Sequence, residues 1–180
     1  MIHDRIELAK HFKELGFTKG AEIGVADGRY SEILLQTIPD LTLSCIDLWR
    51  PYENNWRKQD YHNEAYEKTL KRIRPYPKAT AIPFPSIEAS LNVPDESLDF
   101  VFIDGSHTFD HVMTDIIIWT RKVKKGGIVA GHDYYHFHDS GVVEAVNKYT
   151  EEHKIDLNLT LKDYAEHKDD KCPCWWFIKQ

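Results

Sequence analysis

Acidic and imidazole side chains follow two apolar segments of the chain, at positions where a strand would end. In "SLDFVFIDGSHTFDHV" the apolar run stops at Asp104, and His107 comes three residues later. In "GGIVAGHDYYHFH" the next apolar run stops at His132 and Asp133. Carboxylate and imidazole groups bind divalent ions and move protons. These residues are therefore candidates for a metal site and for a general base.

A glycine-containing loop follows an earlier apolar segment and carries acids of its own. In "AEIGVADGRY", Glu22 precedes Gly24 and Gly28, and both glycines favour a tight turn that lets a ligand approach the backbone. A dinucleotide site has a further glycine between these two and binds a pyrophosphate there. Here Ala26 takes that place, and Asp27 would repel a pyrophosphate. A nucleoside that carries a positive charge fits this loop better.

Asp47 ends the next apolar segment, "LTLSCIDLW". Its two oxygens can accept hydrogen bonds from both hydroxyls of a ribose. Glu22 can accept a hydrogen bond from a ligand ammonium group, and a buried acid satisfied by backbone donors is the alternative. We therefore expect Glu22 to face a cationic ligand rather than the core.

The elements that position these residues alternate along the chain. Apolar segments typical of strands cover residues 21–25, 41–49, 79–84, 97–105 and 126–134, and helical patterns cover residues 1–16, 31–38, a stretch ending at about 73, 86–91, 108–125 and 141–153. Parallel neighbours need crossover connections, so this alternation predicts a parallel sheet with helices on both faces. Two last strand-like runs, 157–164 and 174–180, suit an antiparallel hairpin.

The predicted fold class is therefore α/β, with a Rossmann-like, open and mostly parallel seven-stranded sheet, helices on both faces and a C-terminal antiparallel hairpin. We expect one domain over residues 1–180. In such sheets, ligands bind beyond the carboxyl ends of the strands. The acids and imidazoles above all lie there.

Composition narrows the class of partner. The 180 residues carry a net charge of −6, which disfavours nucleic acid and anionic membranes as partners because phosphate binding relies on clustered Lys and Arg. No run approaches the roughly 20 apolar residues of a membrane span. We expect a cytoplasmic protein with a small-molecule partner, and a homo-oligomer is possible from the sequence. We also expect reduced thiols at Cys45, Cys172 and Cys174.

The stretch "EIGVADG" followed by "CIDLW" resembles the first two motifs of the class I S-adenosylmethionine-dependent methyltransferases. The order of elements is similar to that family over nearly the whole chain. The resemblance implies S-adenosyl-L-methionine as cofactor, with the loop at its methionine end, Asp47 at its ribose and other residues at its adenine. The cofactor-binding residues implied are Glu22, Gly24, Ala26, Gly28, Asp47, Leu48, Trp49, Ser86, Ile87 and Asp104.

The strand-end acids and imidazoles are similar to those of small-molecule O-methyltransferases of the catechol and macrolide-sugar types. The resemblance implies that Asp104, His132 and Asp133 hold a divalent metal, Mg or Mn, and that His107 is the general base with Asp104 beside it. The methyl acceptor would be a hydroxyl of a sugar or a phenol. His132 stands where those families usually have Asp, and imidazole favours softer ions such as manganese, iron or zinc.

Other interpretations remain open. His107 can act without a metal, the chain can be a nucleoside-binding protein without chemistry, or the strand-end residues can be ordinary cap and turn residues. An NAD-dependent dehydrogenase is disfavoured by the missing middle glycine. Related chains that resemble cephalosporin-hydroxylase-type proteins leave another reaction open.

Three further segments received structural interpretations. We interpret His136, His138 and Asp139 as a substrate loop rather than a second metal site. In "CPCWW" we expect buried thiols rather than a zinc site with His167. The aromatic and basic residues of 49–76 indicate a solvated helix or a lid over the site.

Overall fold

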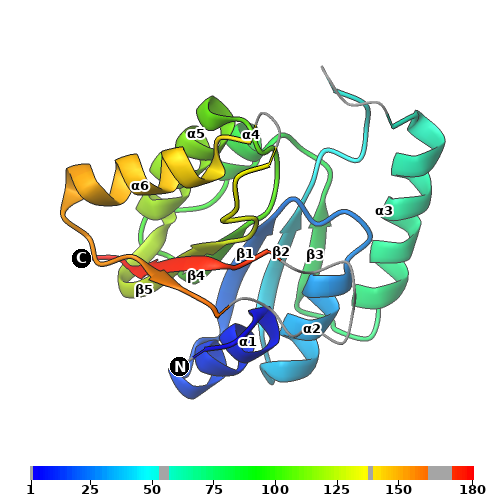
Figure 1. Ribbon diagram of the computed structural model, residues 1–180. Coiled ribbons are helices and arrows are strands. Elements are labelled where there is room, and N and C mark those ends of the chain that lie inside the picture. Colours follow the sequence, from blue (N-terminus) through cyan, green and yellow to red (C-terminus); the bar gives the residue numbers. More distant parts are fainter. Residues whose placement is uncertain (1, 53–56, 138–139, 162–171) are drawn as a thin grey trace.

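The computed structural model describes residues 2–52, 57–137, 140–161 and 172–180 (Figure 1). The helices are α1 Arg5–Glu14, α2 Arg29–Thr37, α3 Gln59–Ile73, α4 Ser86–Ser90, α5 Phe109–Lys122 and α6 Val142–His153. The strands are β1 Lys19–Ile23, β2 Thr42–Ile46, β3 Ala79–Ile82, β4 Leu98–Ile103, β5 Val123–Gly131, β6 Asn158–Leu159 and β7 Trp175–Ile178.

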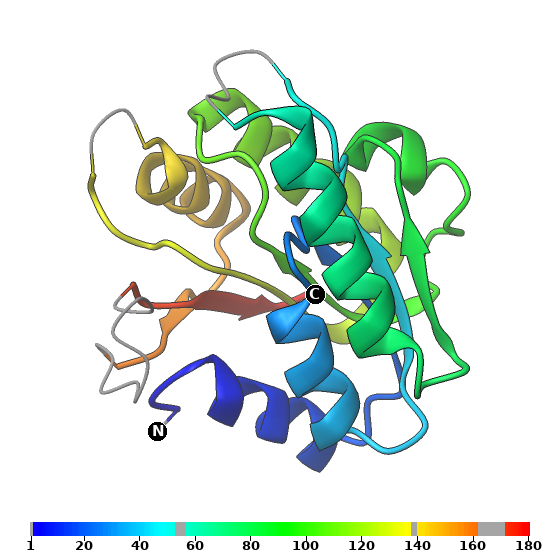
Figure 2. The ribbon, with the colours of Figure 1, turned by 90° about the vertical axis from the view of Figure 1, so that its right-hand side faces the viewer.

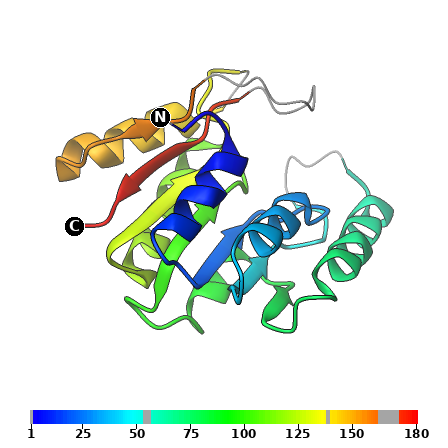
Figure 3. The same cartoon turned by 90° about the horizontal axis from the view of Figure 1, so that it is seen from below.

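Within the described residues, the strands form a seven-stranded sheet in the order β3-β2-β1-β4-β5-β7-β6. Strands β1 to β5 pair in parallel, whereas β7 is antiparallel to both β5 and β6. Figure 3 shows β6 and β7 at one edge of the sheet. The predicted fold class is confirmed, including the C-terminal antiparallel hairpin.

Two hydrophobic cores cover the two faces of the sheet. Helices α1, α2 and α3 pack on one face, where Phe12, Leu34 and Phe102 are fully buried. Helices α4, α5 and α6 pack on the other face, around Ile116 and Trp119. Figure 2 shows α2 and α3 beside each other in front of the sheet. Burial on both faces explains the almost continuous apolar runs of β4 and β5.

The boundary between α5 and β5 differs from its prediction in a way that has a clear cause. The helical pattern extends to residue 125, but α5 ends at Lys122 and β5 already begins at Val123. The backbone of Gly126 has a φ of +79°, which a helix cannot accommodate. Val123 pairs with Leu98 instead, and Lys124 Nζ lies 2.6 Å from an oxygen of Asp99. Pairing with β4 therefore overrides the local helical pattern.

Two other expectations concern the surface and the thiols. No helix in the described part of the chain is long and apolar enough to cross a membrane. Of the two thiols in "CPCWW", Cys174 is buried as expected, whereas Cys172 is only half-buried; Cys45 is buried as well. His167 of the alternative zinc interpretation lies outside the described residues.

Candidate active site

The carboxyl ends of β4 and β5 bring four predicted residues together. Ile103 pairs with Gly131, so the residues that follow each strand emerge side by side. The backbone N–H of His132 donates to Ile103 O at 3.1 Å. A Cβ on Gly131 would lie 2.5 Å from that same carbonyl oxygen, so only glycine allows this close approach. The register thus places His132 and Asp133 opposite Asp104.

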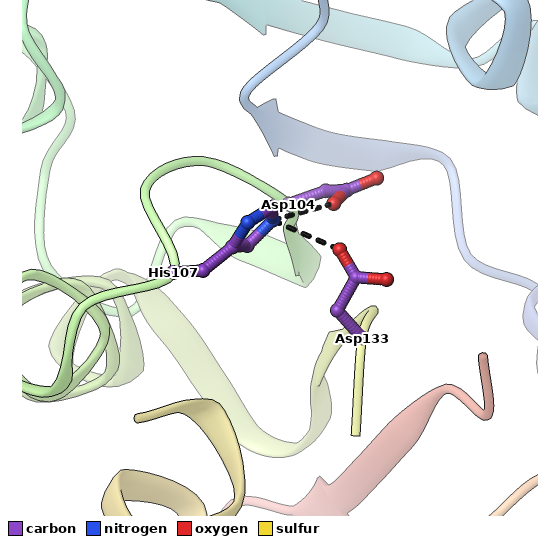
Figure 4. A group of neighbouring side chains, drawn as sticks. All are labelled: Asp104, His107 and Asp133. Carbon is purple, nitrogen blue, oxygen red and sulfur yellow. Dashed lines mark ion pairs between the residues drawn. The ribbon is translucent and has the colours of Figure 1, made fainter. Parts of the chain in front are cut away.

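Asp133 lies at the centre of the resulting cluster. His107 Nε2 is 2.8 Å from Asp133 Oδ2 and 3.9 Å from Asp104 Oδ1 (Figure 4). His132 Nδ1 is 3.0 Å from Asp133 Oδ1 and 3.9 Å from Asp104 Oδ1. Asp133 has a φ of +57°, a conformation that aspartate tolerates better than most residues. Two imidazoles and two carboxylates therefore share one strand-end cluster.

The pKa values in this cluster reflect the two carboxylates. Asp104 and Asp133 raise the pKa of His107 to about 9, because their negative charges favour the imidazolium form. Burial raises the pKa of Asp133, but hydrogen bonds from His107 and His132 outweigh burial and hold that pKa far below its usual value. The raised pKa favours the protonated form of His107 at neutral pH when only these groups surround it, whereas a general base works best with a pKa near the working pH.

The donor set fits a divalent cation. Asp104, His107 and Asp133 each offer one ligand atom, and these atoms lie within 4.8 Å of one another. Carboxylate and imidazole donors suit manganese, iron or zinc and, through the carboxylates, magnesium. The predicted metal ligands are Asp104, His132 and Asp133, whereas this group contains His107 in place of His132. Both imidazoles contact Asp133, His107 at Oδ2 and His132 at Oδ1.

The glycine loop joins the sheet directly beside this cluster. Gly24 N donates to Ile46 O at 2.8 Å, and Asp104 N donates to Ile23 O at 2.7 Å. Asp47 Oδ2 accepts from Ala26 N at 2.8 Å, so the predicted ribose acid also holds the loop. A carboxylate oxygen accepts more than one hydrogen bond, so Asp47 keeps capacity for ribose hydroxyls.

Trp49 stabilises the glycine loop through a side-chain hydrogen bond. Its side chain is buried, its Nε1 donates to Ala26 O at 2.8 Å, and its ring packs on Tyr66. Thr69 Oγ1 donates to the same oxygen at 3.0 Å, and Arg72 Nε donates to Asp27 O at 3.1 Å. Trp49, a predicted adenine neighbour, therefore also supports the loop, and Leu48, the other such residue, is half-buried. Helix α3 supplies contacts that no local motif indicates.

Glu22 is buried beneath α2, with 2% of its surface exposed. The hydroxyl of Ser31 donates to its carboxyl, and burial raises the pKa of Glu22 to about 8. The sequence-based expectation is a charged Glu22 that faces a ligand. In this structure the Glu22 carboxyl accepts from Ser31 of α2, and its raised pKa favours the neutral form at pH 7.

We expect Glu22→Gln to change how stability depends on pH. The folded-state pKa lies above the ordinary value of 4.5, so between about pH 4.5 and 8 only the unfolded wild type releases this proton. The wild type therefore loses stability as the pH rises through this window, by about 5 kcal/mol at most, and the variant does not. Urea denaturation at pH 5, 6.5 and 8 measures the difference in unfolding free energy.

The matched control is Glu14→Gln, because that side chain is 76% exposed. Its unfolding free energy should follow the pH profile of the wild type. A Glu22→Gln variant with that same profile would show that Glu22 is ionised in the folded protein.

The predicted adenine-edge residues lie at the start of α4. Ser86 Oγ donates to Asp115 Oδ1 at 2.5 Å and accepts from Trp119 Nε1 at 2.7 Å. Ile87 is 51% exposed. Sequence reasoning missed Asp115, which is buried on α5 inside a pattern that indicates only an amphipathic helix.

A cavity of about 330 Å³ lies between the glycine loop and α3. Its lining residues are Ala26, Asp27, Arg29, Tyr61, Glu64, Ala65 and Lys68. The charges in this lining are paired, with 3.0 Å between Arg29 Nε and Asp27 Oδ2 and 2.6 Å between Lys68 Nζ and Glu64 Oε1. None of these lining residues belongs to the strand-end cluster, so the cavity lies beside the glycine loop and away from that cluster.

Aromatic side chains flank His107. Phe137 contacts the His107 ring edge-on at a centroid distance of 5.6 Å, and Tyr135 stacks with Phe137 at 6.4 Å. His136, in the predicted substrate loop, points to Glu144 with 3.3 Å between Nδ1 and Oε1. His138 and Asp139 of that loop lie outside the described residues, as do residues 53–56 of the predicted lid.

The strand order, the glycine loop and the acid after β2 together define a Rossmann-like methyltransferase fold. The model of a family described as "Methyltransferase domain" matches residues 21–134. The chain belongs to this family and is an S-adenosylmethionine-dependent methyltransferase.

Three individual proteins are similar to this chain in sequence or in fold. The uncharacterised protein R132 of Acanthamoeba polyphaga mimivirus is 29% identical over 177 residues, which cover 97% of this chain and 75% of that protein. An O-methyltransferase from Bacillus cereus in complex with SAH superposes with a TM-score of 0.70 at 11% identity, covering 97% of this chain and 80% of that one. The N-methyltransferase NodS from Bradyrhizobium japonicum has a TM-score of 0.65 at 14% identity, covering 97% and 94%. At these identities the solved structures show a shared fold.

Proposed function

We propose that this protein transfers a methyl group from S-adenosylmethionine to a hydroxyl of a small molecule, with a divalent metal held at the strand-end cluster. The observation that carries this proposal is the convergence of Asp104, His107 and Asp133 within 4.8 Å. Asp104 also adjoins the glycine loop through its hydrogen bond to Ile23. The reacting oxygen and the sulfonium methyl can therefore meet at one edge of the sheet.

The cofactor would lie across the ends of β1, β2 and β3. The glycine loop would face its methionine end and Asp47 its ribose, since Asp47 Oδ2 already accepts from the loop at Ala26 N while Oδ1 accepts from Trp49 N. Trp49 would pack near the adenine and would also hold the loop through its hydrogen bond to Ala26. The residues proposed to line the cofactor are Glu22, Gly24, Ala26, Gly28, Asp47, Leu48, Trp49, Ser86, Ile87 and Asp104.

His107 would take the proton of the acceptor hydroxyl. Asp104 and Asp133 would hold the metal, with the imidazole of His132 as nitrogen ligand, so that His107 stays available to take the proton. A bound divalent cation orients an acceptor oxygen and lowers the pKa of its hydroxyl. With both carboxylates committed in this way, less negative charge faces His107, and its pKa falls toward the range that suits a general base.

A metal-independent route is the second candidate. The direct contact of 2.8 Å between His107 Nε2 and Asp133 Oδ2 supports it, because a carboxylate can orient an imidazole and stabilise its protonated form. His107 and Asp133 would then act as a base and its orienting acid. Loss of activity with a chelator separates the two routes.

The flanking aromatic residues bear on the acceptor. Phe137 and Tyr135 present ring surface next to His107, and aromatic rings stack favourably with other rings. Of the two acceptor types considered, a phenol matches this surface better than a sugar.

Calorimetric titration with S-adenosylmethionine, S-adenosylhomocysteine and NAD, with and without Mg²⁺ or Mn²⁺, tests the cofactor. Both sulfur nucleosides should bind and NAD should not. Asp47→Ala should weaken binding by about 100-fold, because charge-assisted hydrogen bonds to ribose are lost. Asp40→Ala is the matched control, since Asp40 is 81% exposed and pairs with Lys78. Binding of NAD alone would overturn the proposal.

Methyl transfer to panels of phenols and sugars, with and without EDTA, tests the reaction. Transfer that stops with EDTA and returns with Mn²⁺ or Mg²⁺ supports the metal-assisted route. Transfer that persists with EDTA supports the second candidate. Cofactor binding without transfer to any acceptor favours a nucleoside-binding protein.

A further inference from the structure

Asp115 is a buried carboxyl group that the proposed mechanism does not use. It lies on α5 with 7% of its surface exposed. Its Oδ1 accepts the hydroxyl hydrogen of Ser86 at 2.5 Å, and Ser86 Oγ in turn accepts from Trp119 Nε1 at 2.7 Å. The Ser86 hydroxyl therefore has a fixed orientation, with its only hydrogen committed to Asp115.

The second oxygen of Asp115 faces the end of β4. Oδ2 lies 3.8 Å from the position that a Cβ atom on Gly105 would take, and Gly105 directly follows Asp104. In the described part of the chain, Ser86 is the hydrogen-bond donor to this carboxyl. The Asp115 carboxyl thus lies between the start of α4 and the end of β4, where the adenine edge of the cofactor is proposed to lie.

A buried carboxylate with one donor is costly, because desolvation disfavours its charge. Burial accordingly raises the pKa of Asp115 to about 6, and the hydrogen bond from Ser86 offsets burial only in part. A ligand N–H group that reaches Oδ2 would satisfy the remaining lone pairs. Adenine carries such a donor, its exocyclic 6-amino group, on the edge that would face α4.

We propose that Asp115 is a specificity-determining residue that accepts a hydrogen bond from the 6-amino group of the adenine, with Ser86 and Trp119 holding the carboxyl in place. This inference rests on the proposed function, since it requires the adenine edge to lie at Ser86. It assigns to α5 the discrimination between 6-aminopurine and 6-oxopurine nucleosides. A 6-oxo group would place its lone pairs against the carboxylate and would be rejected.

The test compares the affinities for S-adenosylhomocysteine and S-inosylhomocysteine, which differ in the 6-amino and 6-oxo groups. The wild type should prefer the adenosyl compound by about 10- to 100-fold, the range expected for a hydrogen bond to a charged group. Asp115→Asn can turn its amide N–H₂ toward a 6-oxo group, so the preference should shrink to about threefold or reverse. Asp110→Asn, an exposed position on the same helix, should keep the wild-type preference.

The outcomes separate this inference from the proposed function. If the wild type binds neither nucleoside, the proposed function fails. If it binds S-adenosylhomocysteine and Asp115→Asn keeps the wild-type preference, the proposed function stands and the role of Asp115 is overturned. A role confined to folding would weaken both ligands equally. If Asp115→Asn does not fold, Asp115→Ser replaces it, with loss of the preference as the supporting result and its retention as the contrary one.

Discussion

Replacing His107 by glutamine is expected to lower kcat for methyl transfer by about 100- to 10,000-fold, the usual contribution of a general base. Glutamine keeps a polar side chain of similar reach but cannot take a proton at neutral pH. His107 Nε2 lies 2.8 Å from Asp133 and within the cluster that includes Asp104, so its replacement removes the proposed proton acceptor without disturbing either hydrophobic core. The affinity for S-adenosylhomocysteine should change by no more than about threefold, because that ligand lacks the reacting methyl group.

Single-turnover rates with saturating cofactor measure this effect. His136→Gln is the matched control, because His136 is 70% exposed and pairs with Glu144 rather than with the cluster. A rate for His107→Gln equal to that of the control would remove His107 from the reaction. Measurements with and without Mn²⁺ distinguish a base from a metal ligand, since a lost ligand also raises the metal concentration needed for activity.

Gly24→Ala is expected to abolish cofactor binding and to lower the free energy of unfolding by more than about 4 kcal/mol. The backbone φ of Gly24 is +86°, and an added Cβ would lie 2.1 Å from the carbonyl oxygen of Asp104. That atom belongs to backbone held by the hydrogen bond from Asp104 N to Ile23 O, so it cannot move without separating β1 from β4. The clash therefore damages the glycine loop and the end of β4 that carries Asp104 together.

The control for Gly24→Ala is Gly16→Ala. Gly16 also has a positive φ, +75°, but an added Cβ there meets no atom within 4 Å. It should cost only about 1 to 2 kcal/mol of left-handed backbone strain and leave cofactor binding intact. Circular dichroism melts and calorimetric titration of both variants measure the two quantities. Equal losses in the two variants would contradict the proposed clash.

Much of the fold was predictable because its signals are local. Alternating apolar runs and amphipathic helices require crossover connections, and these produce a parallel sheet with two covered faces. The prediction failed at Val123, where a helical pattern continues into residues that pair with β4. The pairing of Val123 with a distant strand sets that boundary, and the local sequence pattern does not indicate this pairing.

The candidate site was predictable to the same degree and for the same reason. The sequence by itself determined that acids and imidazoles end β4 and β5 and that Asp47 follows β2, because parallel strands end at one edge of a sheet. Only the tertiary structure decided that both His107 and His132 contact Asp133 beside Asp104, and that Glu22 is bonded to Ser31. It also brought Asp115 to Ser86 from another helix. Such contacts depend on the packing of helices that are far apart in the chain, and local sequence patterns do not indicate this packing.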